Sequence, residues 1–109
     1  MKYCVVFMTA PQGPEARSLA HMLLKKRLCA CVNIVKGMAS FFWWQGKIDA
    51  AGESLLIAKT EQRLVKTIIR EVSRAHSYSV CEVIALPIVA GHAPYLKWIS
   101  SSLKKGRQA

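Results

Sequence analysis

The sequence predicts a single α+β domain, in which an antiparallel sheet carries helices on one face. Hydrophobic residues make up 52% and charged residues 20% of the 109 positions, which is enough apolar material to bury one core. Apolar runs and amphipathic repeats follow the order strand, helix, strand, strand, helix, strand, and a further helix comes last. The two middle strands are joined by a short turn and form a long hairpin. This order is typical of the ferredoxin-like arrangement, also called split βαβ.

The first half of the chain supplies a strand, a helix and the first arm of the hairpin. Residues 2–9 form a nearly continuous apolar run, which is typical of a strand buried on both faces. Residues 14–28 begin with a proline, a favourable first residue of a helix, and repeat apolar side chains at helical spacing. Residues 29–35 and 38–44 have strand character, and Lys36-Gly37 between them indicates a bulge or a bend.

The second half supplies three more elements and a tail after the hairpin turn. These are the return strand at 47–59, a helix ending at 76–79, a buried strand at 80–89, a short helix from 94 to 103, and a polar tail at 104–109. Thr60 is placed to cap the first of these helices, and the tail is expected to fray. No internal repeat or linker interrupts the pattern, so residues 1–109 are expected to form one domain.

The length of the hairpin predicts assembly. Each arm has roughly 13 to 15 residues and spans about 43 Å or more at about 3.3 Å per residue. A compact domain of this size has a diameter of roughly 34 Å, so the tip should extend beyond the domain. The consecutive side chains of Phe41, Phe42, Trp43 and Trp44 point to both faces of the strand. Other copies of the chain could cover both faces; the alternative is packing of the hairpin against the C-terminal helix.

Basic residues dominate the charge balance, with 16 Lys and Arg against 6 Asp and Glu and a net charge of +10. This charge favours polyanions, anionic ligands or acidic partners without identifying one. Arg63, Lys66, Arg70 and Arg74 recur at near-helical spacing, which indicates a solvated helix face, with a nucleic-acid surface as the weaker alternative. Residues 47–55 of the third strand lack the aromatic residues of RNA-recognition domains, so no nucleic-acid partner is expected.

Other function classes find no support in the sequence. No segment approaches the roughly 20 apolar residues of a membrane-spanning helix, so no membrane partner is expected. The first apolar run is too short for a signal peptide, so the four cysteines are expected to be reduced and the protein cytoplasmic. A Walker loop, a dinucleotide-binding glycine motif and a nucleophile elbow are all missing, and no enzymatic activity is expected.

Residues able to bind a ligand gather near the last strand. His76, Tyr78 and Glu82 bring an imidazole, a phenol and a carboxylate into one passage from helix to strand, although His76 could serve only as a helix C-cap. Glu53 and Lys59 face the same side of the return strand but lie about 20 Å apart. They cannot form one site within a chain, which favours a cleft between chains.

The cysteines allow a soft-metal interpretation and a packing interpretation. Cys29 and Cys31 would present their thiols on one face of an extended strand, where they could chelate an ion such as Cu(I). Small core residues are the more ordinary role of both, and of Cys4 and Cys81 within apolar strands.

Five motifs occur in order along residues 3–103. They are Thr9-Ala10-Pro11, Ala30-Cys31-Val32-Asn33-Ile34, Trp44-Gln45-Gly46-Lys47 followed by Glu53 and Lys59-Thr60, His76-x-Tyr78 with Glu82, and Tyr95-Leu96-x-Trp98-Ile99. With these motifs the chain resembles the CutA family of divalent-cation tolerance proteins. The resemblance implies a ferredoxin-like subunit, a homotrimer interlocked through long hairpins, an assembly like that of the PII signal-transduction proteins, and a link to tolerance of divalent metals, copper especially.

The sequence departs from the family pattern at two places. The family commonly has H-P-Y-x-x-P-E where this chain has Ser77 and Cys81 in place of the prolines, which puts the rigidity of the loop in question. Some relatives offer copper a cysteine before T-A-P and two adjacent histidines; this chain has Met8, Ala75 and His76 there. Met8 could serve as a soft Cu(I) ligand, with core packing as its more ordinary role.

The resemblance leads to the hypothesis of a cytoplasmic homotrimer that takes part in the response to divalent metal ions. Clefts between its subunits would bind copper, another divalent cation or a small anionic ligand. The cleft residues expected are Trp44, Lys47, Lys59, Tyr78 and Glu82, and the expected metal contacts are His76 and Met8. The alternative hypothesis is a non-enzymatic, PII-like trimeric signalling or scaffold module whose clefts bind a partner protein.

Overall fold

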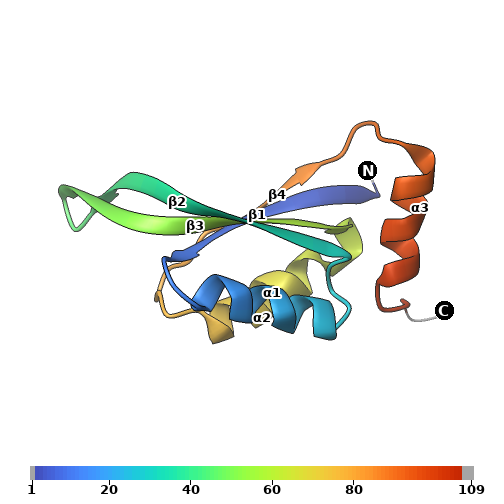
Figure 1. The fold of residues 1–109 in the computed structure, drawn as a ribbon, viewed down its shortest axis with the longest axis horizontal. Helices are drawn as coiled ribbons and strands as arrows, with labels where there is room; N and C mark the ends of the chain where they lie inside the picture. The colour runs from blue at the N-terminus through green and yellow to red at the C-terminus, as the bar shows by residue number, and fades with distance from the viewer. Residues whose placement is uncertain (1, 107–109) are drawn as a thin grey trace.

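The chain folds into a four-stranded antiparallel sheet with helices packed on one face (Figure 1). The structure is a computed structural model and describes residues 2–106. Its elements are β1 (Tyr3–Pro11), α1 (Glu15–Lys25), β2 (Cys31–Trp44), β3 (Lys47–Glu61), the 3₁₀ turn η1 (Gln62–Leu64), α2 (Val65–Ala75), β4 (Val83–Pro87) and α3 (Ala93–Ser102). The strand order β2-β3-β1-β4 confirms the ferredoxin-like fold class.

The core lies between the sheet and the pair α1 and α2. Alternate side chains of the central strands, such as Met8 of β1 and Leu56 of β3, are fully buried on this face. They belong to the same cluster as Leu23 of α1 and Ile68 of α2. In Figure 1, α3 stands at the end of the sheet where β1 begins, and its Ile99 completes the cluster.

The opposite face of the sheet is also apolar. Within residues 2–106, no helix covers the part of this face that lies next to the hairpin. We call this surface the open face. Phe7 of β1 and Ile57 of β3 are half-buried there, whereas Val35, Ile84 and Leu86 on the outer strands are between 43% and 51% exposed. The strand predicted at 80–89 is therefore shorter than expected and is not buried, because β4 is an edge strand whose outer face has no cover within the subunit.

The hairpin formed by β2 and β3 extends far beyond the helices, as its length predicted (Figure 1). The principal extents of the molecule are 47 × 26 × 25 Å. At the tip, Gln45 and Gly46 both have positive φ, at 50° and 78°, which is the geometry of a two-residue type I′ turn. The predicted bulge is confirmed: Lys36 and Gly37 of β2 together face Ser54 of β3.

Two local predictions were wrong. Thr60 does not cap a helix: it lies fully buried in β3 opposite Cys4, and its hydroxyl donates to the carbonyl of Leu28 at 2.6 Å. The chain passes through η1 before α2 begins, so the helix starts later than the capping pattern indicates. Fraying of the tail at 104–109 stays a prediction: the backbone N–H of Lys104 donates to the carbonyl of Arg27 at 2.8 Å, and residues 107–109 lie outside the described part of the chain.

A candidate ligand-binding groove at the base of the hairpin

A groove with a volume of about 840 Å³ runs along the open face where the hairpin leaves the body of the subunit. The aromatic end of β2 and the facing part of β3 form its floor, and the segment 78–82 between α2 and β4 forms one wall. Its lining residues are Thr9, Met38, Ser40, Phe41, Phe42, Trp43, Trp44, Asp49, Ala50, Ala51, Glu53, Leu55, Tyr78, Ser79, Val80 and Glu82. The size is that of an ordinary small-molecule site.

His76 holds the wall of the groove in place. The residue caps the end of α2, and its ring is fully buried. Its Nε2 donates to the carbonyl of Thr9 at 2.7 Å, so Nδ1 is free to accept the backbone N–H of Tyr78 at 3.0 Å. The backbone N–H of Ser77 donates to the carboxylate of Glu15 at 2.8 Å. These contacts position the loop where the family's prolines are replaced by Ser77 and Cys81.

Glu53 and Tyr78 form the polar centre of the groove. The Glu53 residue is only 6% exposed, and its carboxylate lies close enough to the Tyr78 phenol to affect the pKa of that group. Burial raises the pKa of Tyr78, and the neighbouring carboxylates of Glu53 and Glu15 raise it further. The phenol is therefore protonated at neutral pH and serves as a hydrogen-bond donor.

The structure brings some of the expected cleft residues together and separates others. Trp44, Tyr78 and Glu82 line the groove. Lys47 and Lys59 do not line it within the subunit. Lys59 lies farther along β3, where its ammonium contacts the side-chain oxygen of Asn33 and approaches the Cys31 thiol at 4.0 Å.

The two expected metal contacts lie in different surroundings. Met8 is fully buried on the helix-covered face of the sheet, in the core. His76 has both ring nitrogens engaged within the subunit. In residues 2–106, no group of three or more His, Cys, Asp or Glu side chains is placed to hold a metal ion. Cys29 is buried ahead of β2, and burial raises the pKa of its thiol to about 12, so it does not present a thiolate.

Sequence reasoning missed part of the groove floor. Asp49, Glu53 and Leu55 share the open face because alternate residues of a strand point the same way. On β2 the facing side chains are Met38 and Phe42, which pair with Glu53 and Asp49. Strand alternation alone could have placed the three β3 residues on this face. The positions of Met38 and Phe42 depend also on the bulge, which shifts the alternation of β2 by one residue.

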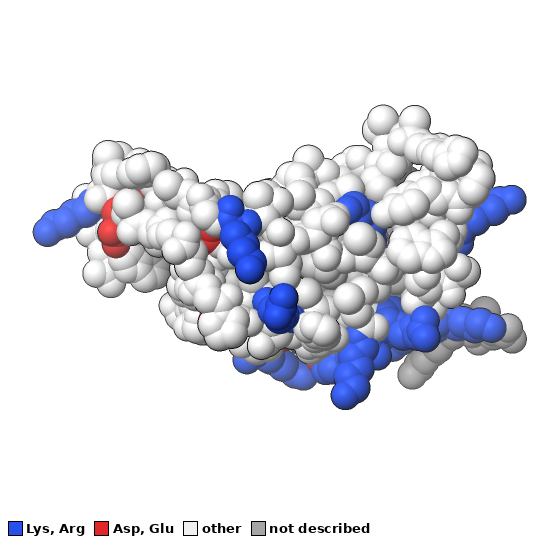
Figure 2. Space-filling view, viewed as in Figure 1, with Lys and Arg blue, Asp and Glu red and all other residues white. Residues whose placement is uncertain are grey.

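The charges of the subunit are unevenly distributed (Figure 2). In this view the acidic atoms lie toward the hairpin, whereas most basic atoms lie over the helices and the C-terminal end. Three of the six acidic residues of the chain, Asp49, Glu53 and Glu82, line the groove, and its lining includes no Lys, Arg or His. The groove is therefore an acidic region of a basic protein.

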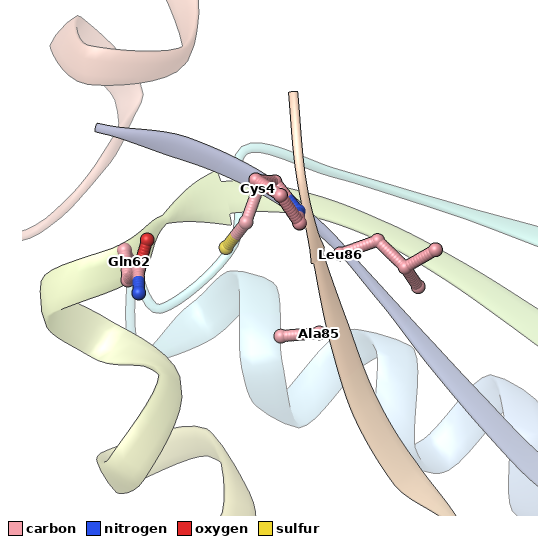
Figure 3. Close-up of a pocket in the computed structure, with 5 residues that line it drawn as sticks. Cys4, Gln62, Ala85 and Leu86 are labelled. Carbon is pink, nitrogen blue, oxygen red and sulfur yellow. The ribbon is translucent and has the colours of Figure 1, made fainter. Parts of the chain in front are cut away.

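A second, smaller cavity of about 260 Å³ lies beside β4 and is lined by Cys4, Gln62, Ala85, Leu86 and Pro87 (Figure 3). Burial raises the pKa of the Cys4 thiol, so this cysteine behaves as a small apolar residue. The cavity offers mainly apolar surface and one amide, and we interpret it as a packing gap at the edge of the sheet.

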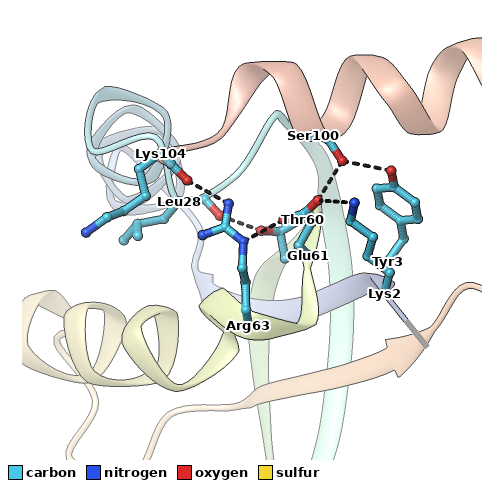
Figure 4. A network of polar contacts seen from close by, with 8 residues as sticks. All are labelled: Lys2, Tyr3, Leu28, Thr60, Glu61, Arg63, Ser100 and Lys104. Carbon is cyan, nitrogen blue, oxygen red and sulfur yellow. Dashed lines mark hydrogen bonds and ion pairs between the residues drawn. The ribbon is translucent and has the colours of Figure 1, made fainter. Parts of the chain in front are cut away.

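A polar network fastens α3 to the other end of β3 (Figure 4). The Tyr3 hydroxyl lies 2.7 Å from the Ser100 hydroxyl, which in turn donates to the buried Glu61 carboxylate at 2.5 Å. Arg63 donates to the other oxygen of Glu61 at 2.6 Å and to the carbonyl of Lys104 at 2.6 Å, and Lys2 adds an ion pair at 3.6 Å. The network ties α3 and the residues after it to β1 and β3.

Comparisons with known proteins place this geometry in a family. The family model described as the CutA1 divalent ion tolerance protein matches residues 4–102. "Protein CutA 1, chloroplastic" of Oryza sativa subsp. japonica is 42% identical over 101 residues, which are 93% of this chain and 57% of that protein. "Divalent-cation tolerance protein CutA" of Archaeoglobus fulgidus is 41% identical over 99 residues, 91% of this chain and 96% of that protein. The chain thus spans little more than half of its plant relative.

Solved structures agree with the sequence comparisons. CutA1 from Oryza sativa superposes with a TM-score of 0.94 at 40% identity and covers 97% of each chain. The divalent cation tolerance protein from Thermus thermophilus gives a TM-score of 0.91 at 38% identity, with 94% of this chain and 99% of the other covered. The fold and the groove define a class of ferredoxin-like subunits with a long protruding hairpin. Within that class, the chain belongs to the CutA family of divalent-cation tolerance proteins.

Proposed function

We propose that the chain acts in tolerance of divalent metal ions as a cytoplasmic homotrimer. In this proposal the open face and the hairpin of each copy pack against the other copies, and the grooves lie in the clefts between them. The observation that carries the proposal is the apolar open face, where Ile84 and Leu86 of β4 and Val35 of β2 remain exposed beside the aromatic hairpin.

Physical chemistry favours assembly over a stable monomer. Full burial of an aliphatic side chain contributes about 1.5–3 kcal/mol, so water contact along a whole sheet face is unfavourable. Soluble monomers seldom expose contiguous apolar surfaces of this kind. The hairpin adds Phe41, Trp43 and Ile48, each at least 68% exposed, on the strand face opposite to that of Phe42 and Trp44. Both faces of the tip therefore need partners, and a closed ring of identical copies can supply them.

Copper or another divalent cation is the proposed link to metal tolerance. The residues of one subunit do not fit a preformed metal site, because Met8 is buried in the core and both nitrogens of His76 are engaged. Direct metal contact would therefore need donors from more than one copy, or a rearranged loop. Within one subunit, the role of His76 is to hold the loop beside the cleft.

Native mass spectrometry of the reduced protein tests the assembly. We expect a trimer, and we expect Ile84→Asp to abolish it because a charge would be buried between copies. Ile69→Asp is the matched control, since Ile69 is similarly exposed on the outer side of α2. A wild-type protein that stays monomeric at micromolar concentration would overturn the proposed assembly.

The same measurement with Cu(I), Cu(II) and Zn(II) tests the metal link. A stoichiometric mass increment on the trimer supports direct binding. A trimer that takes up no metal would instead favour the second candidate, a PII-like signalling or scaffold module, whose clefts would bind a partner.

A further inference from the structure

We propose that the outer side of the helix layer binds the phosphate backbone of a nucleic-acid duplex without reading its base sequence. The surface is a continuous stretch of exposed basic side chains, which we call the basic band. Its eight residues are half of the Lys and Arg of the chain: Lys25, Lys26, Arg27, Arg63, Lys66, Arg70, Arg74 and Lys104. The inference does not depend on the proposed function, because the helices lie on the opposite side of the sheet from the open face.

One carboxylate joins the two helices within the band. Glu71 of α2 forms an ion pair with Lys26 at the end of α1. The same carboxylate contacts Arg70 at 3.6 Å and Arg74 at 3.5 Å. It holds three cations in one place but neutralises the charge of only one. The cluster therefore keeps a surplus of positive charge, and its side chains are partly fixed before any partner binds.

The other end of the band is joined through backbone carbonyls. The backbone N–H of Lys104 donates to the carbonyl of Arg27 at 2.8 Å, and the Arg63 guanidinium donates to the carbonyl of Lys104 at 2.6 Å (Figure 4). Arg63 also pairs with the buried Glu61. Within residues 2–106, Glu61 and Glu71 are the two carboxylates that contact the band, so most of its positive charge is uncompensated.

The arrangement of these charges does not stabilise the helix that carries most of them. Lys66, Arg70 and Arg74 recur at every fourth position of α2, where side chains are neighbours and like charges repel. Lys66 lies in the first turn, near the positive end of the helix dipole, and this turn has no acidic residue. A solvated helix face typically mixes both signs of charge. The repeat is therefore better explained by an anionic partner.

The side chains of the band favour an extended chain of phosphates. Four of the eight residues are arginines, whose planar guanidinium group can donate two parallel hydrogen bonds to one phosphate. Arg70 and Arg74 have side chains that are 57% and 72% exposed, so most of their five donors are available. With Lys66 they form a row of cations about 6 Å apart along the helix axis. Such a row matches a line of charges better than one isolated anion.

A duplex fits this surface better than a single strand or a membrane. Residues 15–27 and 62–75 contain no Phe, Trp or Tyr, whereas single strands are usually held by stacking on aromatic side chains. Helices that lie on membranes insert a continuous apolar face, but the large apolar side chains exposed here are Leu24 and Ile69, on different helices. A duplex can be bound through its phosphates alone. The expected lack of a nucleic-acid partner came from residues 47–55 of the sheet, so it does not apply to the helices.

The experiment titrates a fluorescently labelled DNA duplex of about 20 base pairs with the full-length protein, between about 50 and 200 mM salt, by fluorescence anisotropy. The variant is Lys25→Gln/Lys66→Gln, which removes one charge of the band from each helix. The control is Lys36→Gln/Lys97→Gln, which removes the same charge from the hairpin and α3. All four lysines are exposed, and within residues 2–106 their side chains form no hydrogen bond or ion pair. Circular dichroism establishes that each variant is folded.

The inference predicts equal affinity of the wild type for two duplexes of unrelated sequence, with binding that weakens as the salt concentration rises. We expect Lys25→Gln/Lys66→Gln to bind about tenfold more weakly, and the slope of log affinity against log salt to be smaller by about 2. The control should bind as the wild type does. A matched RNA duplex in the same titration identifies which form of duplex binds more tightly. The Ile84→Asp variant should still bind, so that failure of the proposed trimer would leave this inference standing.

Several results would overturn the inference. A wild type that does not bind the duplex at the lowest salt concentration would exclude it. Equal weakening in Lys25→Gln/Lys66→Gln and in the control would show that net charge acts without the band. Tighter binding of the single strand would indicate stacking on another surface. Equal competition, charge for charge, by poly-L-glutamate or by phosphatidylglycerol vesicles would show that the band does not select a nucleic-acid duplex.

Discussion

Two buried glutamates of β3, Glu61 at its end and Glu53 at its middle, have opposite surroundings. Glu61 is 4% exposed and contacts Arg63, Lys2 and Ser100, whereas Glu53 is 6% exposed and lies in the groove without a cation. Within residues 2–106, only the Glu61 carboxylate forms ion pairs, to Arg63 and Lys2. The difference teaches that burial alone does not describe a charged residue. The end of the strand holds its carboxylate in a polar network, whereas the middle of the strand presents its carboxylate to the groove.

The largest expected effect comes from removal of the cation that Glu61 already has. Arg63→Met keeps most of the apolar stem but leaves Glu61 with the Ser100 hydrogen bond and the longer ion pair to Lys2, so we expect the free energy of unfolding to fall by about 2 kcal/mol. This expected loss is smaller than that for a fully buried ion pair, because Arg63 is partly exposed. Urea denaturation measures it, with Lys66→Met on the exposed side of α2 as the control. Equal stability of the two variants would remove the contrast between Glu61 and Glu53.

Acidification should remove the stabilising contribution of the ionised Glu61 carboxylate. Burial alone would raise the pKa of this carboxyl, but hydrogen bonds from Ser100 and Arg63 and the charges of Arg63 and Lys2 outweigh burial and hold the pKa below its ordinary value of 4.5. A lowered pKa stabilises the fold above the ordinary value, and this contribution is lost as the pH falls through the folded-state value. We therefore expect the Tm to decrease below about pH 4.5.

The control for this prediction is Glu61→Gln, whose Tm should fall less between pH 5 and pH 3 than that of the wild type. Part of the decrease should remain, because the pKa values of Glu15 and Glu71 are also lowered. Parallel Tm curves for the two proteins over this range would contradict the role given to Glu61.

The smallest effect should come from Glu53→Gln in a monomeric subunit, which the Ile84→Asp background provides. The change removes a buried charge that has no cation and keeps the partner of the Tyr78 phenol. We expect the free energy of unfolding to change by less than about 1 kcal/mol, or to rise. A loss as large as that of Arg63→Met would mean that Glu53 already has an internal counter-charge.

The sequence predicted most of the fold because hydrophobic periodicity is local. The strand at Tyr3–Pro11, both long helices, the hairpin and its bulge all follow from spacing and turn residues. The burial of β4 could not be predicted in this way, because an apolar run does not reveal whether its strand lies at the edge of the sheet. Thr60 was misread because a capping residue and a buried strand residue have the same side chain.

The candidate site could be predicted only in part. Tyr78 and Glu82 were found because they follow a helix end, and Trp44 because it lies at the hairpin turn. Lys47 and Lys59 were expected from the motifs that resemble the family and from a cleft between chains, and neither lysine lines the groove within one subunit. The importance of Glu53 appears only when its burial and its neighbours are known in three dimensions.

The bulge in β2 also has a consequence for changes in chain length. Because Lys36 and Gly37 share one partner on β3, the strand contains one residue more than the pairing requires. A gene that lost the codon for Gly37 could therefore encode an unbroken ladder in which Met38, Phe42 and Trp44 keep their partners and their place in the floor of the groove. This position tolerates a deletion that elsewhere in a strand would exchange its two faces, so a gap in an alignment at this point need not mean a different binding surface.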